Sequence, residues 1–158
     1  MLSVLIDAMT FDGAKFRALH GLGRNDFYVS QEGPDFRLFY PDALGAAPII
    51  PVLPDRLTLE SDAAPGMDGT PRVASNGVAF HTITIKKKSP AGADVPNGAE
   101  ALMFCSGGLA SVSDMAPVLV NGVAQVTVGP ELKSGNIVVC VKDQAGVLLM
   151  AELEIGFG

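Results

Sequence analysis

Hydrophobic and polar residues alternate along much of the chain after residue 54, and this period of two predicts β-strands. The predicted strands are residues 56–62, 78–87, 99–106, 122–129, 136–143 and 147–155. The segments between them are rich in Gly, Pro and Asn, the residues that turns require. Several short strands at near-regular spacing are typical of a sandwich or a barrel, so we expect an all-β fold.

The first part of the chain differs in kind from the rest, because seven of the ten aromatic residues lie within its first 40 positions. Residues 41–54 then carry four prolines, too many for a regular central element, and predict an extended connector. The domain prediction is an N-terminal assembly segment, residues 1–53, followed by a sandwich domain, residues 54–158. The N-terminal segment is expected to be either an aromatic-rich arm or a small extra β/helix element.

Two local elements are predicted within the N-terminal segment. Residues 12–21 predict a short helix, with Asp12 as its N-cap and Gly21 just past its end. Residues 27–30 and 36–40 flank the turn sequence QEGPD and predict a hairpin.

Five stretches in the second half of the chain carry a family likeness. They are HTITIKK, GADVPNGAE, ALMFC, NGVAQVTV and SGNIVVCVKD. Residues 78–156 resemble the bacterial immunoglobulin-like domains of invasin- and intimin-type adhesins, which are also common in tailed-phage structural proteins. The resemblance implies an immunoglobulin-like β-sandwich. It does not select a function, because such domains serve as spacers, adhesins and assembly modules alike.

The stretch NGVAQVTV has a direct physical reading. Asn121 and Gly122 supply the positive-φ positions of a tight turn. In the strand that follows, alternation places Ala124, Val126 and Val128 in the core, whereas Gln125 and Thr127 face outward.

Alternation also assigns faces to three sandwich strands that the resemblance places in one sheet. The inward residues are expected to be Leu102, Phe104, Ile137, Val139, Val141, Leu149, Ala151, Leu153 and Ile155. The outward positions include Ala101, Met103, Cys105, Val138, Cys140, Leu148 and Met150. A sheet face in water should be polar, so an apolar face of this kind is expected to be covered.

Two kinds of structure could cover this apolar face, and a one-residue error in the assumed strand register is a third explanation of the pattern. The aromatic N-terminal segment folds over the face, or another subunit or partner packs there; a slip by one residue would instead exchange the two faces. The predicted interface residues are Met103, Cys105, Val138, Cys140, Leu148 and Met150, together with Phe27, Tyr28, Phe36, Phe39 and Tyr40. Cys105 and Cys140 are expected to be free thiols in soft contact on neighbouring strands, with a cross-strand disulfide as the alternative.

Composition adds constraints on the class of partner. Hydrophobic residues make up 48% and charged residues 18% of the chain, and the excess apolar surface favours a protein partner. The net charge of −6 argues against a nucleic-acid binder. The basic run at residues 86–88 is expected to end a strand or protect a sheet edge. No apolar run is long enough to span a membrane, and the N-terminus lacks the basic start of a signal peptide, so synthesis in a cytosol is expected.

No constellation in the sequence predicts catalysis, a metal site or a cofactor. His81 lies in strand phase with Ile83 and Ile85 and is expected to be a hydrogen-bonded structural histidine. DAAPGMDGT lacks the alternating acidic ligands and the closing glutamate of a calcium loop. GLGRND lacks the third glycine of a nucleotide-binding loop. An enzyme with Cys105 or Cys140 as its nucleophile is a third and weaker possibility, since neither has a nearby histidine in sequence.

The predicted function is a non-enzymatic structural or assembly protein that contacts itself or other virion proteins. The specific hypothesis is a capsid decoration or head accessory protein of a tailed phage or phage-like particle, assembled in the host cytoplasm as an oligomer or on a larger assembly. The alternative is a cell-surface adhesion or carbohydrate-binding immunoglobulin-like module.

Overall fold

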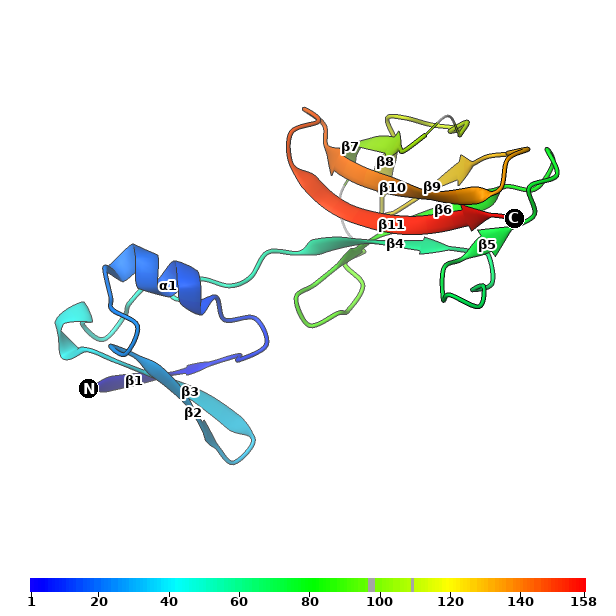
Figure 1. Ribbon diagram of the computed structural model, residues 1–158. Coiled ribbons are helices and arrows are strands. Elements are labelled where there is room, and N and C mark those ends of the chain that lie inside the picture. The colour runs from blue at the N-terminus through cyan, green and yellow to red at the C-terminus, as the bar shows by residue number, and fades with distance from the viewer. Residues whose placement is uncertain (97–98, 109) are drawn as a thin grey trace. The chain divides into compact units, whose positions relative to one another are not determined.

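A computed structural model describes residues 1–96, 99–108 and 110–158. The chain divides into two compact units, Met1–Pro54 and Asp55–Gly158 (Figure 1). Each unit has a hydrophobic core of its own. The first unit is therefore folded around its own apolar residues, as a small β/helix element rather than an extended arm.

The first unit contains a three-stranded antiparallel sheet, one helix and one short turn of 3₁₀-helix. Its elements are β1 (Leu2–Ile6), α1 (Gly13–His20), β2 (Tyr28–Glu32), β3 (Asp35–Tyr40) and η1 (Asp42–Leu44), and the strand order is β1-β3-β2. The predicted hairpin is β2–β3, with Glu32 paired to Asp35 across its turn. The core consists of Phe16 from the helix and Leu38 and Tyr40 from the central strand, all at most 1% exposed.

Helix α1 begins and ends where its capping residues predict. The Asp12 carboxylate accepts a hydrogen bond from the main-chain N–H of Lys15 at 2.9 Å, and this satisfies one of the free donors of the first turn. Gly21 adopts the left-handed conformation, with φ of 62°, and its N–H donates to the Arg17 carbonyl. The helix prediction is confirmed.

Removal of the N-cap gives the first prediction. Asp12→Ala is expected to lower the free energy of unfolding of the first unit by about 1 kcal/mol, because a helix N–H loses its partner. Both tyrosines of the chain lie in this unit and the chain has no tryptophan, so tyrosine fluorescence during urea unfolding reports on this unit alone. Lys15→Ala is the matched control: the Lys15 donor is a main-chain group, so an equal loss in this variant would contradict the capping role.

The second unit is a β-sandwich. Its strands are β4 (Arg56–Ser61), β5 (Arg72–Val73), β6 (His81–Lys88), β7 (Ala99–Ser106), β8 (Val118–Val120), β9 (Val123–Val128), β10 (Gly135–Asp143) and β11 (Leu149–Phe157). They are hydrogen-bonded in the order β4-β6-β9-β8-β7-β10-β11-β5, and the chain curls so that β11 lies against β4. Each pairing between these strands is antiparallel except the one between β11 and β5. Asn97 and Gly98 of the predicted turn before β7 lie outside the described residues.

The core of the sandwich lies between the inward faces of its two layers. The buried residues are Leu57, Ile83, Ile85, Leu102, Phe104, Leu119, Val126, Val128, Val139, Val141, Ile155 and Phe157. The inward assignment is confirmed for β7, β9 and β10, where buried positions alternate with more exposed ones.

The turn between β8 and β9 confirms the reading of Asn121 and Gly122. Both have positive φ, 52° and 76°, which is the backbone of a two-residue type I′ turn, and Val120 pairs with Val123 across it. The turn packs tightly against the loop between β6 and β7. A Cβ atom on Gly122 would lie 2.0 Å from the Val95 carbonyl oxygen of that loop.

The inward assignment is wrong at the start of β11. Val141 pairs with Ala151 and Lys142 with Leu149, so the register shifts between them and Met150 is the extra residue of a β-bulge. The bulge exchanges the two faces on its N-terminal side. Met150, predicted to point outward, packs against the core, whereas Leu149, predicted to point inward, is 50% exposed.

His81 is a structural residue, as predicted. Its side chain is fully buried, and its two ring nitrogens lie 2.8 Å from the Gly156 carbonyl oxygen and 2.8 Å from Ser61 Oγ. Because a carbonyl only accepts, Nε2–H donates to Gly156, and Nδ1 accepts from the Ser61 hydroxyl. The imidazole thereby connects β4, β6 and β11 inside the sandwich.

Candidate functional site

The outward side chains of β7, β8 and β10 form a continuous apolar surface, which we name the outer face. Strand register places these residues opposite one another: Ala99 pairs with Val120, Ala101 with Val118, and Cys105 with Cys140. The outer face comprises Ala99, Ala101, Met103, Cys105, Val118, Val120, Val138 and Cys140, and it continues onto β11 through Leu149.

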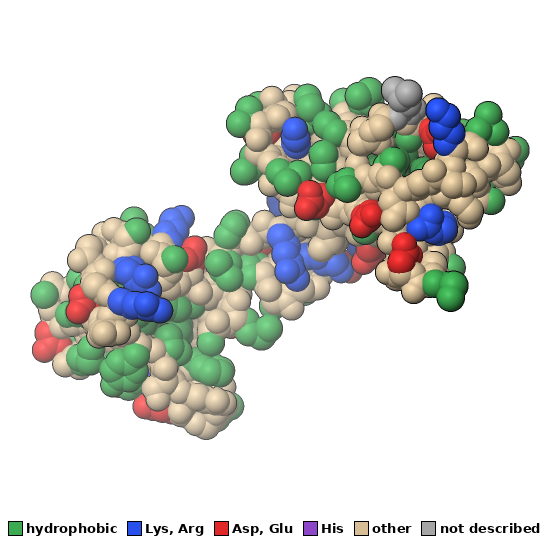
Figure 2. Space-filling model, in the orientation of Figure 1, with side chains coloured by type: hydrophobic (Ala, Val, Ile, Leu, Met, Phe, Trp, Pro, Cys, Tyr) green, Lys and Arg blue, Asp and Glu red, His purple; other side chains and the backbone are tan. Residues whose placement is uncertain are grey.

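Several large apolar side chains of the outer face are exposed to solvent. Met103 is 37%, Val138 45% and Val120 60% exposed, and Leu148 in the adjoining turn is 61% exposed. Figure 2 shows hydrophobic side chains gathered over the end of this unit at which Figure 1 places the turn between β10 and β11. Contiguous apolar surface of this kind is typical of a protein–protein contact site.

Charged residues border the outer face along one side. Glu152 and Glu154 on β11 stand opposite Cys140 and Val138 at this border, whereas Lys142 lies within the face, between Met103 and Leu149. An apolar centre with a charged rim is the usual anatomy of a protein-binding surface.

The predicted interface residues of the N-terminal unit have different environments. Tyr40, predicted to lie in an interface, is 1% exposed and belongs to the core of its own unit, because it faces inward on the central strand β3. Phe27 packs partly buried against Phe16, with ring centroids 5.1 Å apart, and Phe36 is half-buried. Tyr28 and Phe39 stack across neighbouring strands with centroids 4.9 Å apart, and Tyr28 remains 51% exposed.

The three lysines at the end of β6 are all paired with acidic side chains. The Lys86 ammonium lies 3.0 Å from Glu60, the Lys87 ammonium lies 3.1 Å from Glu100, and Lys88 pairs with Asp94. The carboxyl of Glu60 holds the pKa of Lys86 above its ordinary value. The run is therefore locally neutralised, as expected of a strand end rather than of a phosphate-binding patch.

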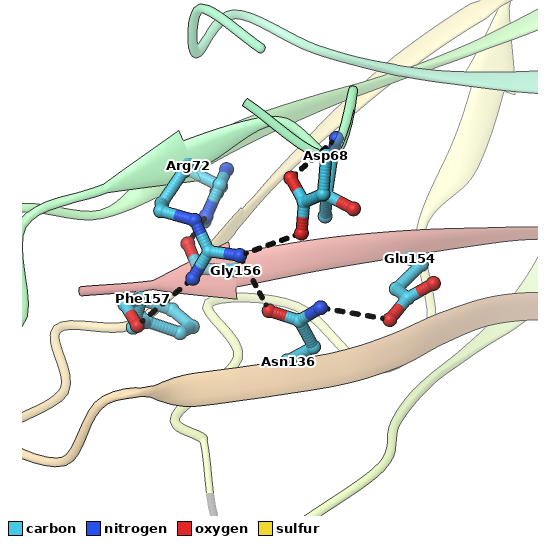
Figure 3. A network of polar contacts seen from close by, with 8 residues as sticks. Asp68, Arg72, Asn136, Glu154, Gly156 and Phe157 are labelled. Carbon is cyan, nitrogen blue, oxygen red and sulfur yellow. Dashed lines mark hydrogen bonds and ion pairs between the residues drawn. The ribbon is translucent and has the colours of Figure 1, made fainter. Parts of the chain in front are cut away.

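Arg72 fixes the loop before β5 to the last strand of the sandwich (Figure 3). Its guanidinium donates to the Asp68 carboxylate at 3.1 Å, to the Asn136 side-chain oxygen at 2.8 Å and to the Phe157 carbonyl at 3.3 Å. Asn136 in turn donates to Glu154 at 2.9 Å. The Thr70 N–H and then the Arg72 charge lower the pKa of Asp68. These contacts join segments far apart in sequence and position the acidic rim of the outer face.

The chemistry available at the outer face is limited. Among the described residues, no three His, Cys, Asp or Glu side chains come together as metal ligands. In the same part of the chain, no helix has both the length and the apolarity needed to cross a bilayer. The arrangement suits binding by apolar contact.

Sequence reasoning missed four residues of the outer face, of which one is Ala99 at the start of β7. Val118 and Val120 lie on β8, and Leu149 reaches the face only through the bulge. A signal for β8 exists, because a two-residue turn at Asn121 and Gly122 requires a partner strand immediately before it.

Comparisons with known proteins bear on the fold. No family model and no curated protein matches the sequence. The D00-D0 domain of intimin is similar to this chain with a TM-score of 0.52 and 14% identity, over 99% of this chain and 92% of that one.

Two glycosidases are also similar, over a smaller share of this chain. A glycosyl hydrolase family 2 member from Bacteroides cellulosilyticus matches 65% of this chain with a TM-score of 0.55 and 17% identity. A β-glucuronidase from glycoside hydrolase family 2 matches 65% with a TM-score of 0.54 and 16% identity. The chain spans only 14% and 11% of these two proteins, so their catalytic activity does not transfer to it. At these identities the likeness concerns the fold alone, and the fold is an all-β, immunoglobulin-like sandwich, as the sequence predicted.

Proposed function

We propose that this chain is a non-catalytic interaction module that binds a protein partner through the outer face. The exposed apolar surface of β7, β8 and β10 is the observation that carries the proposal. Burying such side chains contributes about 25 cal/mol per Å² of apolar area, so a complementary partner gains substantially by covering them. The acidic rim of Glu152 and Glu154, together with Lys142 inside the face, would orient that partner.

The assembly that we propose is a tailed-phage or phage-like particle, on which the chain acts as a capsid decoration or head accessory protein. The sequence resemblance to domains common in phage structural proteins supports this choice. A small module with one apolar face and a compact second unit is suited to binding repeated sites on a shell. In this proposal the chain is assembled onto the particle in the host cytoplasm.

Adhesion at a cell surface is the second candidate, and one observation favours it. The likeness to intimin covers both units of this chain and nearly all of the matched intimin segment. In that case the outer face, or the exposed Tyr28–Phe39 stack, would contact a receptor or a glycan.

A binding experiment separates the two candidates. The purified chain is mixed with empty tailed-phage shells, with bacterial cells and with a glycan array, and binding is quantified by co-sedimentation or fluorescence. Val138→Glu places a charge in the outer face and is expected to weaken binding on the order of 100-fold. Val78→Glu is the matched control, because Val78 is 74% exposed, lies outside the outer face and receives the same change.

Each outcome decides something. Binding to shells that Val138→Glu abolishes supports the particle component. Binding to cells or glycans, without binding to shells, replaces it by the adhesion module. Equal losses for Val138→Glu and Val78→Glu, or a stable monomer that binds no target, contradict the role of the outer face.

A further inference from the structure

Two thiols meet in the middle of the outer face. Cys105 on β7 and Cys140 on β10 are direct partners in the antiparallel register, and both are free and half-buried. Their chain neighbours Phe104, Val139 and Val141 are buried in the core, so both strands are held firmly beneath the thiols. The two sulfurs therefore form a fixed and solvent-accessible pair.

The spacing of this pair suits a covalent bond between the sulfurs. Residues directly opposite in an antiparallel pair have Cα atoms about 4.5 or 5.5 Å apart, depending on the hydrogen-bonding pattern. A disulfide requires a Cα separation of about 4.4–6.8 Å. Either pattern satisfies that range, so no strand has to move before the bond can form.

We propose that Cys105 and Cys140 form a dithiol modification site, which low-molecular-weight disulfides such as oxidised glutathione convert to a cross-strand disulfide. The geometry of the site depends only on the register of β7 and β10 and not on the proposed partner. Because both thiols lie in the outer face, a partner bound there would cover them, so the exchange takes place on the free chain.

The exchange takes place in two balanced steps. A thiolate of the pair attacks oxidised glutathione, forming a mixed disulfide and releasing one glutathione thiolate. The second cysteine loses its proton to solvent and attacks the protein sulfur of the mixed disulfide, which releases the second glutathione thiolate. Two electrons pass to the oxidant, and the two released thiolates take up protons.

The environment of the Cys140 thiol slows its attack at neutral pH. Burial, and then the neighbouring Cys105, raises the pKa of the Cys140 thiol above its ordinary value. Because the thiolate is the nucleophile, a raised pKa leaves little of the reactive form, and the rate rises as pH increases. The thiol–disulfide balance of the surroundings decides which form persists, so the pair is expected to remain reduced in a cytosol and to close in an oxidising medium.

Formation of the Cys105–Cys140 disulfide would stabilise the folded sandwich. The bond would join β7 to β10 and enclose residues 106–139, including β8 and β9, in a covalent loop. A loop of this length restricts the unfolded chain strongly, and the melting temperature of the second unit is expected to rise by about 10 °C. A free chain that folds in the reduced state would then be stabilised when its surroundings become oxidising.

The test uses the full chain in buffers of reduced and oxidised glutathione at pH 7 and pH 8.5, with intact-mass spectrometry after alkylation. The expected product is a monomer that has lost both free thiols, carries no glutathione and melts at a higher temperature, with dithiothreitol reversing each change. The reaction is expected to be faster at pH 8.5. Cys105→Ala and Cys140→Ala are each expected to stop at one glutathione adduct.

A second measurement requires no substitution. Phenylarsine oxide binds paired thiols much better than isolated ones, and the reduced wild-type chain is expected to retain one equivalent. Two stable glutathione adducts per chain, disulfide-linked dimers as the main product, or failure to retain the arsenical would each overturn the proposal. So would unreacted thiols at pH 8.5 in oxidised glutathione.

Discussion

Gly122→Ala is expected to be among the most damaging single changes in the second unit, lowering its free energy of unfolding by about 3 kcal/mol or more. Two effects act together at this position. The left-handed backbone, with φ of 76°, disfavours any Cβ atom, and the new methyl group would lie 2.0 Å from the Val95 carbonyl oxygen. The Val95 oxygen belongs to the main chain, so the clash is relieved only if the turn or the loop between β6 and β7 moves. Hydrogen exchange of peptides from residues 55–158, during denaturant titration, measures the loss.

Gly69→Ala is the matched control for this prediction. Gly69 has a similar φ of 81°, but no atom lies within 4 Å of the position that its new methyl group would take. Only the backbone penalty applies there, about 1 kcal/mol. Equal losses in the two variants would show that the close packing against Val95 contributes nothing.

His81→Leu is expected to lower the free energy of unfolding of the second unit by about 3 kcal/mol. The substitution removes both ring hydrogen bonds and leaves the Gly156 carbonyl without its buried donor, a cost of about 1–3 kcal/mol for each unsatisfied group. Ser61→Ala removes the hydroxyl that donates to Nδ1 and accepts from the Ala63 N–H, but it keeps the buried bond from Nε2–H to Gly156, so it is expected to cause a smaller loss. Denaturant midpoints, followed by far-UV circular dichroism, rank the variants.

Thr82→Leu serves as the control for the histidine variant. Thr82 neighbours His81 on β6, points to the other face and is partly exposed, so its replacement is expected to change stability by less than about 0.5 kcal/mol. A His81→Leu variant as stable as Thr82→Leu would rule out the proposed role of the buried imidazole.

Local chemistry explains which parts of this fold are predictable from sequence. The Asp12 and Gly21 caps define α1, and Asn121 and Gly122 define the β8–β9 turn, because each acts through groups only a few residues away. Alternation likewise predicts which residues of β7, β9 and β10 are buried, since the period of two is a property of the strand itself.

Features that depend on distant partners could not be predicted in this way. Strand β5 has two residues and exists because it pairs with β11, more than 80 positions later. The bulge at Met150 follows from the pairing of β11 with β10, and it changed the faces assigned to Leu149 and Met150. The sequence assigns Tyr40 to an interface because it is one of many aromatic residues in the N-terminal segment. The packing of β3 against α1 instead places it in the core of that unit.

The outer face was predictable from sequence in one part and not in another. The alternation that buries Phe104 and Val139 also leaves Met103 and Val138 exposed, so its centre was predictable. Its extent was not, because Val118 and Val120 join it through the short strand β8 and Leu149 joins it through the bulge. The identity of a partner depends on a second molecule and leaves no local pattern in the chain.

The sandwich can complete its folding only after β11 has been synthesised. This last strand pairs with β10 and β5 and lies against β4, while Arg72 ties its end to the loop before β5. Until residues 149–157 leave the ribosome, β10 has an unpaired edge and the core is open on one side, a state that attracts other strands. Pairing between segments so far apart in sequence is slow, so association with other chains competes with folding while this edge of β10 is unpaired.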